Sequence, residues 1–334
     1  MGTERRSDVN ITYFLRLLLA MALFMVWTEL AVAVEYPTKA VTIVVPFPPG
    51  GSADVQARLI GKGLAERLGK PVLIDNRPGA GGRIGAGLAA RAVPDGHTLL
   101  FGSISTLVLE PVLRTNVGFD PQRDFAPITV VSEMPFLIVV SSSGATKSIA
   151  DLLASARKQS GALTYASWGP GSAGHLLGEM LSSIAGIKIL HVPYKGEAPA
   201  MMDLMGGQVS MMFVSSLAAM PHVRAGKLRA LAVTGPRRLS ALPDVPTLGE
   251  SSIPGVDLMA WFGFVVPAKT PQDIVARLHK DITDVLNSRE FVQWAVGQGV
   301  VVVASSPSTL AQRIQSESAS IVKVVNSTKL NLDE

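Results

Sequence analysis

The sequence predicts an α/β protein of two domains, and three observations support this. The chain has 334 residues, more than one ordinary domain and enough for two. From residue 148 onward, short β-branched segments alternate with segments whose apolar residues recur at helical spacing. Near the start, residues 41–54 place an apolar strand directly before a glycine turn and a helix. Such alternation predicts a parallel sheet with helices on its faces.

The first of these strand-to-helix turns is the most informative. Residues 41–45 form a β-branched run, and the prolines that follow cannot donate to a sheet ladder, so the strand ends there. Gly50 and Gly51 allow a tight turn, and Ser52 is expected as the N-cap of the next helix, which Gly69 ends.

The start of that helix is a candidate anion site. Its first amides have no partner within the helix and point outward at the positive end of the helix dipole, which favours a carboxylate or a phosphate. The Ser52 hydroxyl either caps the helix or donates to a ligand. Asp54 lies in the first turn, where a negative side chain is favourable in any case. A plain strand-to-helix turn is the alternative interpretation.

The other expected elements follow from the same patterns. Strands are expected at residues 71–75, 98–101, 163–166, 188–192, 209–213, 228–234 and 300–303, and residues 128–131 and 136–140 as two paired or consecutive strands. Helices are expected at residues 81–92, 149–156, 175–184, 198–205, 273–286, 289–297 and 310–325, with another near residue 215.

Composition excludes several classes of function. Apolar residues make up 48% and charged residues 17%, so the chain is globular. The net charge of +4 comes from 30 basic and 26 acidic residues that are dispersed along the chain, so no nucleic-acid partner is expected. The absence of cysteine removes disulfides, thiol nucleophiles and thiolate metal sites.

No cofactor or metal site is expected. The glycine-rich residues 79–87 lack the G-x-G-x-x-G spacing of dinucleotide-binding turns, and a close-packed helix of small residues explains them better. The five histidines show no close ligand spacing.

The N-terminus has the three parts of a secretory signal peptide. Arginines precede the apolar residues 17–27, and a small-x-small site ends at Ala33, after which cleavage is expected. An uncleaved anchor spanning residues 15–34 is the alternative. Without cysteine there is no lipid anchor, so we expect a soluble periplasmic protein.

Gly/Ser-rich loops follow several strands, at residues 48–52, 102–106, 167–174 and 194–196. In open α/β sheets ligands bind outside the carboxyl ends of strands. These loops offer amides and hydroxyls, so they suit an anion that is held without covalent chemistry.

Three further side chains each allow two interpretations. His175, in the first turn of a helix after a glycine loop, either contacts a ligand or caps and packs. Tyr194 and Trp261 either line an apolar wall around a ligand or belong to the core. An exported serine hydrolase that uses Ser52 or Ser172 is a rival hypothesis, although neither serine has an evident base or a G-x-S-x-G elbow.

The chain resembles the extracytoplasmic solute receptors of tripartite tricarboxylate transporters, the Bug family, over essentially the whole mature sequence. The resemblance rests on eight motifs in the family's order and spacing: YPTKAVTIVVPFPPGGSAD, DNRPGAGG, PDGHTLLFGS, YASWGPGSAGHLLGE, HVPYKGEAPAMMDLMGGQV, AGKLRALAVTGPRR, LPDVPTLGE and WFGFVVPAKTP. It implies a type II periplasmic-binding-protein fold with mixed sheets, in which two α/β domains are joined by two crossover strands around a ligand cleft.

The resemblance also implies the domain boundaries. Residues 1–33 would be the signal peptide, residues 34–138 with 232–334 the discontinuous first domain, and residues 139–231 the second. The crossovers would lie near residues 136–141 and 228–234.

The resemblance further implies the ligand, the partners and the contacts. The ligand would be a small organic acid, a di- or tricarboxylate or an aromatic carboxylate, and the monomeric receptor would pass it to membrane permease subunits or, alternatively, to a membrane sensor. The implied ligand contacts are Phe47, Gly50, Gly51, Ser52, Asp54, Gly102, Ser103, Ser167, Ser172, His175, Tyr194, Lys195, Gly196 and Ser215.

One position departs from the family pattern. Family members commonly carry an acidic residue just after the phenylalanine of a V-x-M-F strand, whereas here Val214 and Ser215 follow Phe213. The departure argues against recognition of an ammonium group at this position and favours a ligand that is only an acid.

Overall fold

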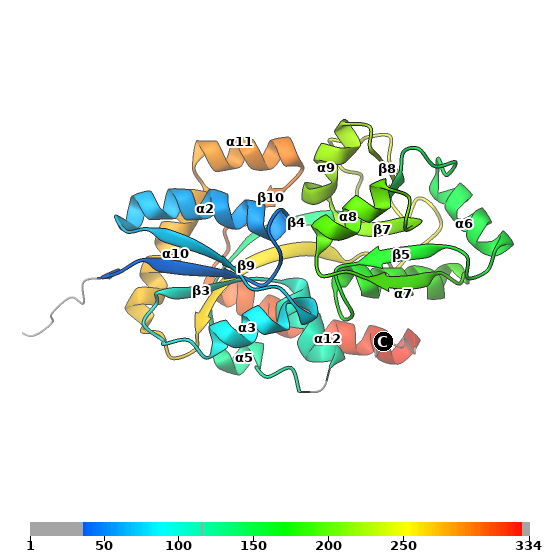
Figure 1. The fold of residues 1–334 in the computed structure, drawn as a ribbon. Helices are drawn as coiled ribbons and strands as arrows, with labels where there is room; N and C mark the ends of the chain where they lie inside the picture. The colour runs from blue at the N-terminus through cyan, green and yellow to red at the C-terminus, as the bar shows by residue number, and fades with distance from the viewer. Residues whose placement is uncertain (1–35, 115, 329–334) are drawn as a thin grey trace, which may run out of the picture. The chain divides into compact units, whose positions relative to one another are not determined.

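One mixed β-sheet runs through the described chain (Figure 1). The computed structural model describes residues 36–114 and 116–328, so the predicted signal peptide lies outside the described residues. From Lys39 on, these residues belong to one structural unit. In it, the sheet has ten strands. Eight of them follow the order β2-β1-β3-β9-β4-β7-β5-β6, and the other two, β8 and β10, pair with β4.

The sheet has two sections that share β4 (Phe125–Ser141). The first section contains β1 (Val41–Val45), β2 (Val72–Asn76), β3 (Thr98–Ser103), β9 (Met259–Pro267) and β10 (Val301–Val302), and the second contains β5 (Thr164–Ser167), β6 (Leu190–Pro193), β7 (Met211–Ser215) and β8 (Leu228–Val233). β1 is parallel to β2 and β3, and β5 to β6 and β7. β4 is antiparallel to β7, β8 and β9, so the sheet is mixed.

β4 corrects the expectation of two separate strands, because residues 125–141 form one strand of 17 residues. Its residues up to Pro135 pair with β9, and from Phe136 on they pair with β7 and β8. Proline lacks the amide proton that a ladder needs, and Pro135 falls where the strand changes partner. The proline therefore marks an exchange of neighbours and not the end of the strand.

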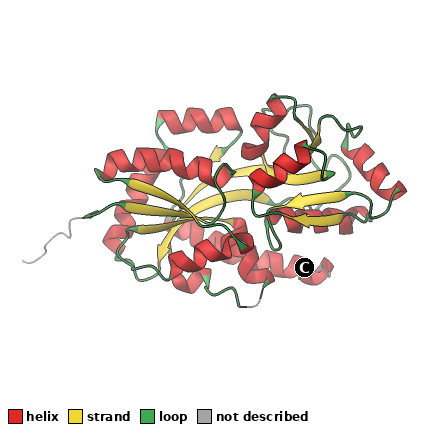
Figure 2. Ribbon diagram, viewed as in Figure 1, coloured by secondary structure: helices red, strands yellow, loops and turns green. Residues whose placement is uncertain are grey.

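Helices cover both faces of the sheet (Figure 2). They are α2 (Ser52–Leu68), α3 (Arg83–Ala90), α4 (Glu110–Leu113), α5 (Pro121–Asp124), α6 (Ile149–Lys158), α7 (Ala173–Ala185), α8 (Glu197–Met205), α9 (Ser216–Arg224), α10 (Gln272–Leu286), α11 (Arg289–Gln298) and α12 (Pro307–Thr328), with the short turns η1 (Ala80–Gly82) and η2 (Ser105–Leu109). In Figure 1, α2, α8, α9 and α11 lie above the sheet, and α3, α5, α7 and α12 below it. Among the described residues no helix is both long and apolar enough to cross a bilayer.

The apolar run that predicted β1 is buried as expected. Val41, Ile43 and Val45 are each 0% exposed, because β1 lies between two parallel neighbours with helices over the sheet. Ile60 and Leu64, one turn apart on α2, are also fully buried. This packing holds the first residues of α2 in a defined place at the end of β1.

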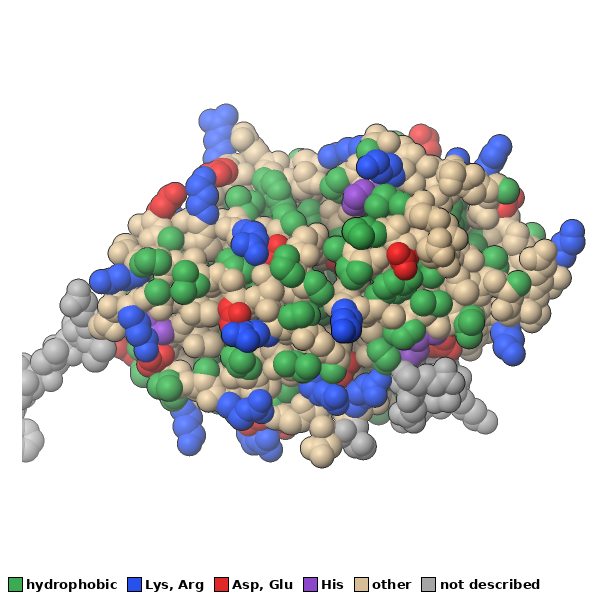
Figure 3. All heavy atoms as spheres, in the orientation of Figure 1, with side chains coloured by type: hydrophobic (Ala, Val, Ile, Leu, Met, Phe, Trp, Pro, Cys, Tyr) green, Lys and Arg blue, Asp and Glu red, His purple; other side chains and the backbone are tan. Residues whose placement is uncertain are grey.

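The surface carries charges of both signs. Figure 3 shows the Lys and Arg side chains of one face dispersed, with Asp and Glu side chains among them. This agrees with the even distribution of charge along the sequence.

Candidate ligand-binding site

The loop after β1 leads into α2 through a glycine turn. Gly50 has a φ of +85°, a conformation that favours glycine. Gly51, in an extended conformation, is the N-cap of α2, and no side chain caps this helix. The expectation that Ser52 is the N-cap is therefore wrong, because Ser52 is the first residue inside the helix and its hydroxyl is directed to another partner.

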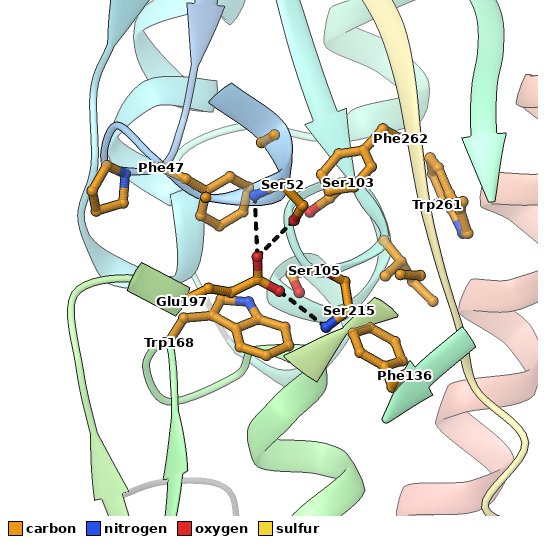
Figure 4. Close-up of a pocket in the computed structure, with 15 residues that line it drawn as sticks. Phe47, Ser52, Ser103, Ser105, Phe136, Trp168, Glu197, Ser215, Trp261 and Phe262 are labelled. Carbon is orange, nitrogen blue, oxygen red and sulfur yellow. Dashed lines mark hydrogen bonds between the residues drawn. The ribbon is translucent and has the colours of Figure 1, made fainter. Parts of the chain in front are cut away.

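That partner is the carboxylate of Glu197, which lies where two helix starts meet (Figure 4). The Ser52 hydroxyl donates to Glu197 Oε2 over 2.6 Å, and the Ser52 amide donates to the same oxygen over 3.3 Å. The Ser215 amide donates to Glu197 Oε1 over 3.3 Å. The three donors thus come from both sections of the sheet and hold one carboxylate.

The backbone explains why a negative group is stable at this point. Ser52 begins α2, Ser215 is the N-cap of α9, and Glu197 is itself the first residue of α8. Each helix start presents unpaired amides and the positive end of its dipole. The starts of α2 and α9, which both donate to this carboxylate, provide the kind of site that the first glycine turn predicted.

A cavity with about 440 Å³ of unfilled space, part of it open to solvent, adjoins these donors. Its wall is mostly apolar and aromatic. The lining residues are Phe47, Pro48, Gly51, Ser52, Ala53, Ser103, Ile104, Ser105, Phe136, Trp168, Glu197, Ser215, Ala260, Trp261 and Phe262. The rings of Phe136 and Trp168 stack with centroids 5.9 Å apart. A hollow with few polar groups on an apolar wall has the lining that is typical of a small-molecule site.

The structure brings part of the predicted site together. Phe47, Gly51, Ser52, Ser103 and Ser215 line the cavity. Tyr194 and Lys195 line a neighbouring cavity, which shares Phe47 and Trp168 with the first. The predicted residues that line neither cavity are Gly50, Asp54, Gly102, Ser167, Ser172, His175 and Gly196.

Asp54 secures the loop at the start of α2. Its carboxylate accepts hydrogen bonds from the Gly50 amide, from Arg58 Nε and from Asn76 Nδ2, each over 3.0 Å. Burial alone would raise the pKa of Asp54, but these hydrogen bonds and the charge of Arg58 lower it below its usual value. Asp54 therefore stays ionised and holds the turn that presents the Ser52 donors.

His175 makes the contacts of a packing residue. Its Nδ1 accepts from the Gly171 amide over 3.2 Å, and its own amide donates to the hydroxyl of Ser172, the N-cap of α7. Its ring stacks on His191 with centroids 4.0 Å apart. Burial, and then the neighbouring His191, lower the pKa of His175 to about 3, so the ring is neutral at neutral pH.

The two aromatic residues singled out in the sequence have different surroundings. Trp261 lines the cavity, and its Nε1 donates to Glu317 Oε2 over 2.7 Å. The Tyr194 hydroxyl donates to Asp203 Oδ2 over 2.7 Å, and burial followed by this bond raises the pKa of Tyr194 to about 12. Trp261 thus matches the apolar-wall interpretation for this cavity, whereas Tyr194 faces the neighbouring one.

Sequence reasoning missed Glu197 and most of the aromatic wall. Glu197 directly follows the predicted residues Tyr194 to Gly196, and Trp168 follows the predicted Ser167. Their positions next to glycine turns were the available signal. Glu197 brings an acidic side chain to Ser215 from another element, although Val214 and Ser215 themselves carry none.

A second carboxylate, that of Glu110, lies against η1 and the loop after β5. The side chain of Glu110 is fully buried, and neither oxygen accepts a hydrogen bond from the described residues. Gly81 of η1 and Gly171 of the loop after β5 approach it so closely that a Cβ atom at either would overlap its carboxylate. Burial raises the pKa of Glu110 to about 7, against the opposing influence of Arg114, whose Nε lies 3.7 Å away.

The fold is a mixed β-sheet in two sections, with helices on both faces. Hydrogen-bond donors at helix starts and an aromatic cavity lie between the two sections, and this arrangement is that of a solute-binding receptor. The chain belongs to the tripartite tricarboxylate transporter family receptors, whose sequence profile matches residues 56–330. BugT of Bordetella pertussis is 34% identical over 296 residues, which are 87% of this chain and 91% of BugT. The resemblance to the Bug family is therefore confirmed.

Solved structures of related proteins share the fold. The Rhodopseudomonas palustris protein Rpa4515, solved with adipate, superposes with a TM-score of 0.85 at 35% identity, over 88% of this chain and 98% of its own. MatC of the same organism, with bound malate, superposes with a TM-score of 0.83 at 33% identity, over 87% and 100%. These neighbours confirm the periplasmic-binding-protein fold predicted from the sequence.

The family consists of receptors and not of enzymes, which decides against the serine hydrolase. The contacts of both candidate serines agree. The Ser52 hydroxyl donates to a carboxylate, and the Ser172 hydroxyl accepts from the His175 amide and not from its ring. Among the described residues, neither hydroxyl is hydrogen-bonded to a histidine ring, the partner that a Ser-His nucleophile has.

Proposed function

We propose that this receptor captures a small organic acid, a di- or tricarboxylate or an aromatic carboxylate, for an uptake system of the tripartite tricarboxylate type. The observation that carries this proposal is the convergence of the Ser52 hydroxyl and the Ser52 and Ser215 amides on one carboxylate. Donors that hold the carboxylate of Glu197 have the geometry to hold that of a ligand.

The expected interaction energies are sufficient to bind such a ligand. Hydrogen bonds to a charged group contribute roughly 1.5–3 kcal/mol each. Three of them, with burial of the ligand body against the aromatic wall, approach the roughly 8 kcal/mol of a micromolar complex once association costs are subtracted. The adipate and malate in the related structures support a carboxylate as the ligand class.

The two sections of the sheet are proposed as two domains, with the boundaries expected from the sequence: residues 34–138 with 232–334, and residues 139–231. β4 passes from one section to the other, and the chain returns between β8 and β9. A ligand that accepts from Ser52 and Ser215 at once bridges the sections and favours their closure.

The cellular setting is proposed from the family and the N-terminus. A receptor of this family works with membrane permease subunits, and residues 1–33 have the composition of a signal peptide for export to the periplasm. Affinity capture of solubilised membranes by the ligand-loaded protein tests this partner. Recovery of a signalling protein instead of permease subunits would favour the sensor hypothesis.

Ligand capture is tested by thermal unfolding of protein freed of bound solute by unfolding and refolding. A ligand at 100 times its dissociation constant adds about 2.7 kcal/mol to the free energy of unfolding and raises the melting temperature. The panel contains di- and tricarboxylates and aromatic acids, with matched alcohols and amides as controls. A panel in which no acid raises the melting temperature, and protein that retains no acid on purification, would contradict capture of an organic acid.

A further inference from the structure

The cavity has an unusual charge balance for a site that binds anions. Glu197 is the one charged side chain among the described residues that line it, and it is negative. Apart from two tryptophan indoles, the remaining polar side chains are four serine hydroxyls, and all four have partners. The Ser52 hydroxyl donates to Glu197, and the Ser215 hydroxyl accepts from the Ala218 amide over 3.4 Å. Ser103 Oγ is 3.4 Å from the Thr106 amide, and Ser105 Oγ accepts from the Ala173 amide over 3.0 Å. No lysine or arginine in this lining offsets a second negative charge.

The donor set accommodates a single carboxylate. Its three donors are directed at Glu197, two at Oε2 and one at Oε1. A ligand carboxylate that uses the same donors must exchange with Glu197. The displaced side chain stays attached to the start of α8, so its negative charge remains at the edge of the cavity.

We propose that the ligand carries one carboxylate on an apolar body, and that Glu197 excludes dicarboxylates from this site. The inference rests on the proposed capture of an organic acid and narrows its class. The ligand carboxylate takes the donors of Ser52 and Ser215. The body packs against the aromatic wall to which Phe47, Trp168 and Phe262 belong.

A second ligand carboxylate has no favourable position in this cavity. It would leave water for a wall of aromatic side chains and would lie close to the displaced carboxylate of Glu197. Desolvation and a like charge both oppose the ionised form. A neutral aromatic body incurs neither the desolvation cost nor the repulsion. The charge of Glu197 therefore selects monocarboxylates over dicarboxylates.

The experiment compares benzoate with adipate by titration calorimetry on protein freed of bound solute. We expect wild type to bind benzoate at least about tenfold more tightly than adipate. Glu197→Gln keeps the size of the side chain and removes its charge, and we expect it to bind adipate more tightly and to lose most of this preference. Glu197→Asp keeps the charge and should keep the preference.

Glu290→Gln is the matched control, because Glu290 is a glutamate whose side chain is 71% exposed. It should bind both acids as wild type does, and far-ultraviolet circular dichroism checks that each variant is folded. Wild type that binds adipate as tightly as benzoate, or a Gln variant that keeps the wild-type ratio, would overturn the inference and leave acid capture intact. If no protein of the set binds either acid or any other acid of the panel, acid capture itself fails and the inference with it.

Discussion

Glu197 and Glu110 are two carboxylates between the same two sections of the sheet, and their surroundings differ completely. Glu197 is partly exposed and accepts three hydrogen bonds from the starts of α2 and α9. Glu110 is fully buried and accepts none from the described residues. The backbone amides that face each group make the difference, because helix starts stabilise a charge whereas the close approach of Gly81 and Gly171 only excludes water.

The largest expected effect comes from Glu110→Gln. The pKa of Glu110 rises from 4.5 to about 7, so the folded protein keeps a proton that the unfolded chain releases above pH 4.5. The stability from this group is fully present below about pH 4.5 and is lost, by roughly 3 kcal/mol, as the pH rises through about 7. We expect the Gln variant to lack this decline, measured as the free energy of unfolding in urea across this range.

Two controls separate the effect of Glu110 from other causes of pH dependence. The lowered pKa values of His175 and His191, at about 3 and about 4, cause stability to fall as the pH drops below about 6.5, but this affects wild type and variant alike. Glu290→Gln controls for loss of an exposed carboxylate. Parallel curves for wild type and Glu110→Gln would mean that Glu110 ionises normally in the folded protein.

Gly81→Ala tests how tightly the chain encloses Glu110. The added Cβ would overlap the carboxylate of Glu110, which is fully buried, and Gly81 has a φ of +63°. We expect a loss of about 2–3 kcal/mol of unfolding free energy from overpacking and strain. Gly207→Ala is the matched control, because Gly207 has a φ of +75° with nothing within 4 Å of its Cβ position.

For Gly207→Ala the strain alone should cost about 1 kcal/mol. Both variants are measured by urea denaturation at one pH. If Gly81→Ala and Gly207→Ala lose the same unfolding free energy, the surroundings of Glu110 can relax. Glu110 would then not be more tightly enclosed than Glu197.

Ser52→Ala has the smallest expected effect and tests the other side of the comparison. It removes the 2.6 Å hydrogen bond to Glu197 but leaves both amides, and water replaces the hydroxyl in this partly open site. We expect a loss of about 1 kcal/mol of unfolding free energy. Ser52→Thr keeps the hydroxyl and should lie within about 0.5 kcal/mol of wild type. A Thr variant as unstable as the Ala variant would mean that packing, and not the hydrogen bond, accounts for the loss.

The local pattern predicted the first loop well. A β-branched run, prolines and two glycines placed the end of β1 and the start of α2 to within a residue, because these signals act over a few positions of the chain. The role of Ser52 was predicted less well. Whether a serine at a helix start caps the helix or donates elsewhere depends on the partner that tertiary structure brings to it.

β4 shows a different limit of local reasoning. The β-branched segments at residues 128–131 and 136–140 were predicted as two strands, and Pro135 lies between them. The strand continues because its partner changes from β9 to β7 and β8 at that residue. A proline in a sequence does not reveal which neighbouring strand lies beside it, so one strand of 17 residues could not be told from two short ones.

The sequence by itself determined the α/β class, the family and the helix starts from which an anion site is built, because periodicity, glycine turns and motif order are properties of neighbouring residues. Only the tertiary structure decided which carboxylate those helix starts hold. Ser52 and Glu197 are 145 positions apart, and a glutamate at the first position of a helix is favourable in any helix, so nothing local distinguishes one that also bridges two sections of a sheet.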